Sequence, residues 1–199
     1  MTGAVRQMKI GLTGGIACGK SLLSRFLNEL GVETLDADDI VHELIPDGER
    51  RRLAATVFKD PVARRALEAR IHPIVKTRLL DFLAFADERP GDSPRQNSDG
   101  DSPLRIAIIP LLFEVHWDEI FDIICCVASE REIQIARMVE RRGYTRAEAE
   151  ARLGAQMPVS EKAAKSHYVI RNDGSAEELR DEAVRFVAWL KERRRKWQT

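Results

Sequence analysis

Short apolar segments alternate with amphipathic segments along most of the chain. The apolar segments predict strands at 8–13, 32–38, 105–110, 122–129 and 167–172. The third and fourth are nearly continuous apolar runs, which are typical of strands buried on both faces. Between the strands, apolar residues recur at helical spacing. This alternation predicts an α/β fold, in which a five-stranded parallel sheet is flanked by helices.

Two neighbouring segments interrupt this alternation. The pattern at 39–86 is helical throughout, which predicts a helical insertion after the second strand. The segment 87–103 is rich in Pro, Gly, Ser and Asp and lacks apolar periodicity, which predicts a flexible surface loop. We therefore expect one domain with its core at 8–38 and 104–199. A final helix at 176–197 carries an apolar stripe and ends in a basic tail that we expect to be solvated.

Composition and charge narrow the choice of partners. The chain has 199 residues, 44% of them hydrophobic, and a formal net charge of zero, which argues against general binding to nucleic acid or to membrane surfaces. The three cysteines include an adjacent pair, Cys125 and Cys126, in an apolar run, which suits reduced thiols in the cytoplasm. No apolar run is long enough to span a membrane, and the first seven residues lack the apolar core of a signal peptide. We expect a monomer or small homo-oligomer that acts on a small molecule.

A glycine-rich loop follows the first strand. The stretch "GGIACGKS" begins at Gly14 and fits G-x-x-x-x-G-K-[ST] in full, and a strand precedes it and an amphipathic helix follows. Backbone N–H groups of such a loop surround a polyphosphate, and the positive end of the helix dipole faces the same anion. Lys20 would reach the β- and γ-phosphates of ATP, and the Ser21 hydroxyl would bind Mg²⁺. Cys18 is either a small filler or, at a helix N-terminus, a reactive thiol.

Other parts of the sequence favour a small-molecule kinase over a motor module or a passive nucleotide sensor. The N-K-x-D motif of regulatory GTPases is absent. A kinase needs a carboxylate near the acceptor hydroxyl, and Asp36, Asp38 and Asp39 end the second strand. Asp38 either faces the cleft or caps the next helix.

A charged segment at 131–157 has two interpretations. Arg137 and Arg141 are four residues apart, share a helix face and could close over the phosphates as a lid, which Gly143 would let move. The alternative is a solvated pair of helices, in which these arginines form salt bridges to Glu140 and Glu148.

Several stretches resemble the dephospho-CoA kinase family, in the family's order and along nearly the whole chain. They are "IGLTGGIACGKS", "LDADDIVHEL", "DGERRRLAATVF", "IHPIV", "IIPLLFE", "QIARMVERRGYTRAEAEARLGAQ" and "YVIRNDGS". The resemblance implies a P-loop kinase fold with a nucleotide-binding core, a helical acceptor-binding insertion at 39–86 and a lid at 131–157. It also implies Mg²⁺-dependent phosphorylation of the ribose 3′-hydroxyl of dephospho-CoA by ATP. Two alternatives stay open: another P-loop kinase acting on a small molecule or a nucleoside monophosphate, and a non-catalytic ATP-binding regulator.

The resemblance also implies roles for individual residues. Asp38 would orient or deprotonate the acceptor hydroxyl, while Lys20 and the lid arginines stabilise the transferred phosphoryl group. The residues that would hold the ATP phosphates are Gly14, Ala17, Cys18, Gly19, Lys20, Ser21 and Leu22, and Asn172 would lie near the adenine. Those on the acceptor side would be His72, Arg52 and Arg78, with Pro110, Leu111 and Glu114 as the cleft floor. His72 precedes a proline, so its alternative role is to brace the start of a helix.

Overall fold

Five parallel strands form the central sheet, in the order β2-β3-β1-β4-β5. The computed structural model describes residues 7–45, 60–84 and 103–197. The strands are β1 (Ile10–Gly14), β2 (Glu33–Asp36), β3 (Arg105–Ile108), β4 (Ile123–Ala128) and β5 (Tyr168–Arg171). Every strand overlaps one of the five predicted segments, so the predicted α/β class and the parallel sheet are confirmed.

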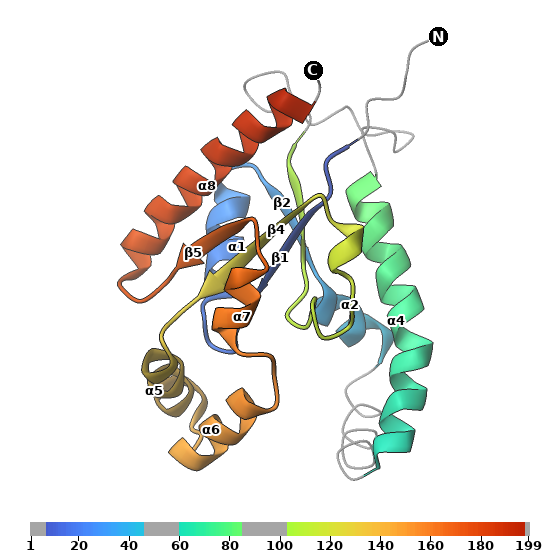
Figure 1. Cartoon of the computed structure of the whole chain (residues 1–199), viewed down its shortest axis with the longest axis vertical. Helices are drawn as coiled ribbons and strands as arrows, with labels where there is room; N and C mark the ends of the chain where they lie inside the picture. Colours follow the sequence, from blue (N-terminus) through green and yellow to red (C-terminus); the bar gives the residue numbers. More distant parts are fainter. Residues whose placement is uncertain (1–6, 46–59, 85–102, 198–199) are drawn as a thin grey trace.

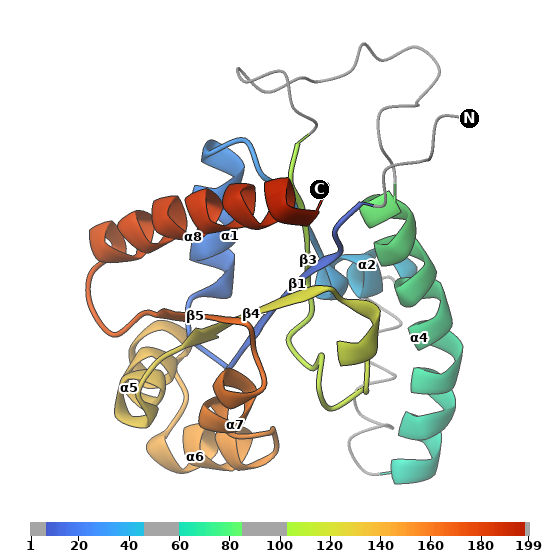
Figure 2. The same ribbon diagram turned by 45° about the horizontal axis from the view of Figure 1, so that its top comes forward.

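Helices cover both faces of this sheet, because successive residues of a buried strand point to opposite sides. In β3, Ile106 and Ile108 join the apolar cluster beneath α1 (Lys20–Glu29) and α8 (Ala176–Trp197). The residue between them, Ala107, belongs to the cluster beneath α2 (Ala37–Leu44) and α4 (Pro61–Ala84). Figures 1 and 2 show α1 and α8 on one side of the sheet and α4 on the other. Burial on both faces explains the continuous apolar runs in the sequence.

The predicted final helix is confirmed as α8, and its apolar stripe is buried. Leu179, Ala183, Phe186 and Leu190 are each at most 1% exposed and pack against the sheet and α1. This packing holds α1 between α8 and the sheet, and it therefore also fixes the glycine-rich loop that leads into α1.

Three helices connect β4 to β5: two lie beyond the carboxyl ends of the central strands, and the third packs back against β1 and β4. They are α5 (Arg131–Arg142), α6 (Arg146–Gly154) and α7 (Val159–Ala164), which follow β4 and lead back to β5 (Figure 1). A short 3₁₀ helix, η1 (Asp118–Ile120), precedes β4. As predicted, α5 ends at Gly143, whose left-handed φ of 67° suits a residue without a Cβ. Ile135, Met138 and Ala149 give α5 and α6 a small core of their own.

The described part of the helical insertion is dominated by α4. This helix continues through Pro73, so His72 lies inside it, and the interpretation of His72 as a brace at a helix start is wrong. Val75, Leu79 and Leu83 attach the second half of α4 to the core. Arg52 and the predicted loop, apart from its last residue, lie outside the described residues. Among the helices that the structure describes, none combines the length and apolarity that crossing a bilayer requires.

Candidate active site

The glycine-rich loop joins the end of β1 to the start of α1. Gly19 is the N-cap residue of α1 and has a left-handed φ of 93°. A Cβ at Gly19 would overlap the Asn172 side-chain amide, and one at Gly14 would overlap the Val127 carbonyl oxygen. Both glycines are therefore required by close packing as well as by backbone conformation. The predicted loop geometry is confirmed at these two positions.

Three side chains hold the loop carbonyl groups in place. Gln134 Nε2 donates to the Ile16 carbonyl oxygen at 3.1 Å, and Asn172 Nδ2 donates to that of Cys18 at 2.8 Å. Arg137 Nη1 approaches the Ala17 carbonyl oxygen at 3.4 Å. In a trans peptide unit the N–H points opposite to the C=O. The N–H groups of Ala17 and Gly19 are therefore directed away from these donors, as an anion-binding loop requires.

The first turn of α1 offers further donors. The N–H groups of Lys20, Ser21 and Leu22 have no carbonyl partner within the helix, since the first intrahelical bond is donated by Leu23 to Gly19. The Ser21 side chain is exposed in this turn. The predicted phosphate-binding residues are thus brought together around one concave loop.

The Cys18 side chain points into the protein interior. It is 0% exposed, and its Sγ accepts a hydrogen bond from Gln134 Nε2 at 2.7 Å. This environment fits the interpretation of Cys18 as a small filler, whose contribution to a bound anion would come from its backbone.

The Lys20 ammonium group lies at the inner side of the loop. It donates to the carbonyl oxygens of Gly14 and Gly15 at 2.9 and 2.8 Å. Burial lowers the pKa of Lys20 below its usual 10.5, and the neighbouring charge of Lys162 acts in the same direction. The carboxylates of Asp36 and Asp38 raise this pKa, so both lie within electrostatic reach of Lys20. An anion placed here would relieve the cost of desolvating the ammonium group.

Two acidic residues at the end of β2 have different local roles. Asp36 is the N-cap residue of α2, and its Oδ1 accepts a hydrogen bond from the Asp38 N–H at 2.9 Å. The capping role that the sequence left open for Asp38 is therefore performed by Asp36. Burial raises the pKa of Asp36 above its usual 3.8, helped by the charges of Asp38 and Asp39. Asp38 is exposed in the first turn of α2, with its side chain available to a ligand.

The segment after β3 contains a buried ion pair that sequence reasoning missed. Lys162 on α7 is 0% exposed, and its Nζ lies 2.7 Å from Glu114 Oε1. The same Nζ donates to the Pro110 carbonyl oxygen at 2.7 Å. The predicted floor residues thus contact α7, while Leu111 is exposed. In the sequence, Lys162 occurs in the polar stretch "SEKAAK", which looks like an ordinary solvated helix.

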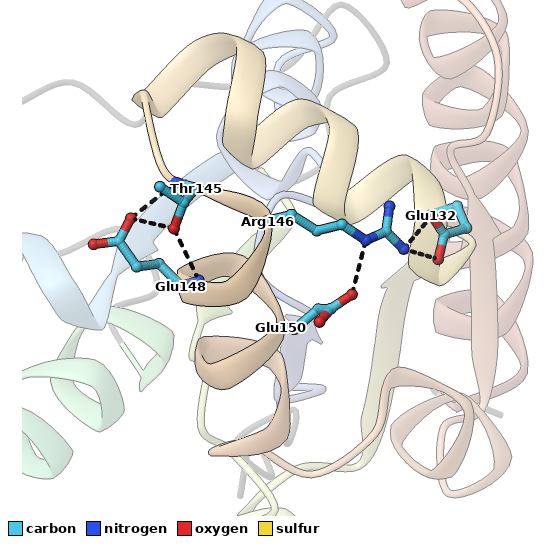
Figure 3. Close-up of polar contacts among 5 residues, drawn as sticks. All are labelled: Glu132, Thr145, Arg146, Glu148 and Glu150. Carbon is cyan, nitrogen blue, oxygen red and sulfur yellow. Dashed lines mark hydrogen bonds and ion pairs between the residues drawn. The ribbon is translucent and has the colours of Figure 1, made fainter.

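The two arginines proposed for the lid differ in their surroundings. Arg137 Nη1 donates to Ser129 Oγ at 3.0 Å and is half-buried, whereas Arg141 is exposed one turn further along α5. The surface ion pairs of this region are made instead by Arg146, at 2.9 Å from both Glu132 and Glu150 (Figure 3). The salt bridges that defined the alternative interpretation, with these arginines paired to Glu140 and Glu148, are not formed among the described residues.

Two of the three residues predicted for the acceptor side lie on α4. The His72 ring contacts Trp117 edge-on, with ring centroids 5.7 Å apart. Arg78 Nη1 lies 2.7 Å from Glu43 Oε2, an exposed pair that links α4 to α2. The helix that carries Asp38 and the helix that carries His72 are therefore directly connected.

A parallel sheet with a glycine-rich loop after its central strand β1, and acids where β2, two strands away, passes into α2, is the arrangement of a P-loop kinase. The sequence profile of the dephospho-CoA kinase family matches residues 8–51 and 46–178. The chain belongs to the dephospho-CoA kinase family. It is 38% identical to the dephospho-CoA kinase of Anaeromyxobacter dehalogenans, over 92% of each protein. It is also 38% identical to that of Geobacter sulfurreducens, over 85% of this chain and 92% of the relative.

Solved structures share the fold. A protein from Thermus thermophilus has a TM-score of 0.72 and 33% identity, with coverage of 92% of this chain and 97% of that one. The dephospho-CoA kinase from Campylobacter jejuni has a TM-score of 0.56 at 23% identity, over 90% and 95% of the two chains, and shows the shared fold. The enzyme is therefore an ATP-dependent kinase that phosphorylates dephospho-CoA, and the alternatives left open by the sequence are set aside.

Proposed function

We propose that phosphoryl transfer occurs between the glycine-rich loop and the first turn of α2, with Asp38 holding the acceptor hydroxyl. The observation that carries this proposal is that Asp38 is exposed in the first turn of α2, at the carboxyl edge of the sheet where the glycine-rich loop also lies, and does not cap the helix. Asp38 would orient the ribose 3′-hydroxyl of dephospho-CoA and accept its proton.

The remaining residues would position ATP. The loop N–H groups and Lys20 would hold the phosphates, and Arg137 and Arg141 would approach them from α5. Asn172 is 6% exposed and braces the loop, and we propose that the adenine lies beside it. Catalysis in this arrangement would come from positioning and from preorganised charge.

Mg²⁺ is compatible with the residues at this site. Among the described residues, no cluster of three or more His, Cys, Asp or Glu side chains is arranged to hold a metal ion. The exposed Ser21 hydroxyl beside Lys20 is a hard oxygen ligand, so we propose that it holds Mg²⁺ together with the phosphate oxygens of ATP. When bound, the ion would neutralise charge on the phosphates.

The acceptor would lie between α2, α4 and the segment after β3. His72, Arg52 and Arg78 are proposed to contact dephospho-CoA, above a floor of Pro110, Leu111 and Glu114. We propose that this reaction takes place in the cytoplasm and in a monomer or small homo-oligomer. The burial of all three free cysteines is consistent with a reducing compartment.

The role of Asp38 is tested by comparison with its neighbour. Asp39 is also exposed in the first turn of α2, so Asp39→Asn is a matched control for charge and position. We expect Asp38→Asn to lower kcat by roughly 10²- to 10⁴-fold with ATP affinity unchanged, because a positioned base is lost. Asp39→Asn should retain most of the activity. Coupled detection of ADP, with ATP, Mg²⁺ and dephospho-CoA, measures both. Equal losses in the two variants would contradict the assignment.

A further inference from the structure

A buried ion pair connects the cleft floor to the end of the lid. The Lys162 ammonium group contacts both Glu114 Oε1 and the Pro110 carbonyl oxygen at 2.7 Å. Glu114 Oε1 also accepts a hydrogen bond at 3.2 Å from the N–H of Met157, the last residue of the lid segment. One carboxylate oxygen therefore joins α7 to the C-terminal base of the lid.

The same contacts continue to the phosphate loop. The Pro110 carbonyl oxygen also accepts a hydrogen bond from Thr13 Oγ1 at 3.2 Å, and Thr13 is the residue before Gly14. Thr13 is fully buried in β1, where it cannot move independently of the sheet. A chain of polar contacts thus extends from Met157 through Glu114, Lys162 and Pro110 to the strand that begins the loop.

The Lys162–Glu114 ion pair is not explained by a gain in folding stability. A lysine that is 0% exposed loses its hydration, and replacing a buried ion pair by apolar residues of similar size is often neutral or stabilising. Glu114 Oε2 is also buried without a hydrogen-bond partner among the described residues. What the pair does provide is fixed geometry, because Lys162 also donates to the Pro110 carbonyl oxygen and Glu114 also accepts from the Met157 N–H.

We propose that Glu114 and Lys162 are positioning residues, whose ion pair fixes the lid base and the cleft floor relative to the phosphate loop. The inference rests on the proposed roles of the lid and of Asp38. The N-terminal end of the lid has its own attachment, since the Glu130 N–H donates to Asp173 Oδ1 at 2.7 Å. Because both ends of the lid segment are attached to the core, Arg137 and Arg141 approach the ATP phosphates from a fixed position.

The test separates the reach of the Glu114 side chain from its charge. Glu114→Asp keeps the charge but withdraws the carboxylate by one methylene from Lys162 and Met157. Glu114→Gln loses the charge but keeps an oxygen that can accept from both. We expect Glu114→Asp to lower kcat by about 10²-fold, because a displacement near 1 Å has that effect. Glu114→Gln leaves the buried Lys162 ammonium group without a counter-charge, so it should lower the midpoint of thermal unfolding more than Glu114→Asp. Because it keeps the length of the side chain, folded Glu114→Gln should lose less kcat than Glu114→Asp, and ATP affinity should be unchanged in both.

Lys162→Met tests the other partner of the ion pair, and a distant ion pair serves as the control. Arg105 Nε and Glu33 Oε2 form a partly buried pair at 2.8 Å, at the other ends of β2 and β3. Glu33→Asp should affect thermal unfolding and leave kcat unchanged, whereas Lys162→Met should resemble Glu114→Asp in kcat. Hydrogen exchange across 131–157 with ATP bound should increase in Glu114→Asp and Lys162→Met, but not in Glu33→Asp.

The outcomes distinguish this inference from the proposed function. Wild-type kcat in folded Glu114→Asp, or a larger loss in Glu114→Gln than in Glu114→Asp, would overturn the positioning role. If Lys162→Met does not fold, the two Glu114 variants still decide the question. Retained turnover in Asp38→Asn would instead contradict the proposed function, whatever the Glu114 variants show.

Discussion

Lys20 in this structure bonds to two carbonyl oxygens of its own loop. These bonds at 2.9 and 2.8 Å replace part of the hydration that burial removes, yet the pKa of Lys20 is still lowered from 10.5. The loop therefore holds an ammonium group whose charge is only partly compensated. A triphosphate is the kind of ligand that would complete the compensation.

The pH dependence of ATP binding should reveal this state of Lys20. ATP binds the protonated ammonium, so affinity should fall as pH rises through the lowered pKa, below the usual 10.5. Across the same window the unfolded state retains the Lys20 proton, so Lys20 makes the ligand-free protein more stable as pH rises. The raised pKa values of Cys125 and Cys126 act in the opposite direction above 9.0, so this second effect is expected as a difference in stability between wild type and Lys20→Arg. Titrations of ATP at increasing pH measure the first effect, and thermal unfolding measures the second.

Lys20→Arg is the control for this prediction. Arginine remains charged throughout the range, so the alkaline loss of affinity should be absent in this variant even if its affinity is lower overall. Identical pH profiles for wild type and Lys20→Arg would show that another group controls binding.

At the scale of elements, the sequence was most informative about the strands and least informative about what braces the loop. The central strands β1, β3 and β4 are buried on both faces and therefore carry apolar runs that the sequence shows directly. The edge strands β2 and β5 are only partly buried, and it was their alternation with helical segments that located them. The glycine pattern identified the loop for a similar reason, because its glycines are sterically required. Gln134 and Lys162 were missed in these roles because their partners lie far away in the sequence, and nothing local distinguishes them from surface residues.

Helix capping shows the same limit on a smaller scale. Asp36 and Asp38 both precede or begin an apolar helical pattern, so spacing alone could not decide which one caps α2. The structure decides it through the backbone, since Asp36 is the last residue of β2 and still extended, and the helical conformation begins at Ala37. Asp38 is thereby free for chemistry.

The capping box of α6 gives a prediction at this scale. Thr145 Oγ1 accepts from the Glu148 N–H at 3.2 Å, and the Thr145 N–H donates to Glu148 Oε2 at 2.8 Å (Figure 3). Thr145→Ala should speed amide exchange in α6 by about fivefold, since one half of the box is lost. Thr145→Ser keeps the hydroxyl and should exchange like wild type. Unchanged exchange in Thr145→Ala would mean that α6 is held by its packing on α5 alone.

This box should also weaken in acid. The hydrogen bonds from Thr145 lower the pKa of Glu148 below its usual 4.5. The Glu148 carboxylate therefore contributes its full stabilisation of α6 above pH 4.5, and this stabilisation is lost as pH falls through the lowered pKa. The exchange difference between Thr145→Ala and wild type should shrink over the same range.

At the scale of the whole molecule, the three cysteines report on different motions. Cys125 and Cys126 lie on β4, between β1 and β5 and beneath helices on both faces. Burial raises the pKa of Cys126 to about 12 and that of Cys125 well above 9.0. Since the thiolate is the form that attacks thiol reagents, neither residue should react while the sheet is intact. Cys18 is equally buried, but it belongs to the loop that we propose to bind ATP.

Thiol labelling followed by mass spectrometry of peptides should therefore separate two rates. Cys125 and Cys126 should be labelled together, at the rate of global unfolding, because no smaller opening exposes a central strand. Cys18 should be labelled faster through opening of the loop, and ATP should slow its labelling far more than that of the pair. Labelling of Cys18 at the rate of the pair, with or without ATP, would show that the loop opens only when the whole molecule does. The Gln134 and Asn172 contacts would then make the loop part of the rigid core, so ATP would bind to a site formed before it arrives.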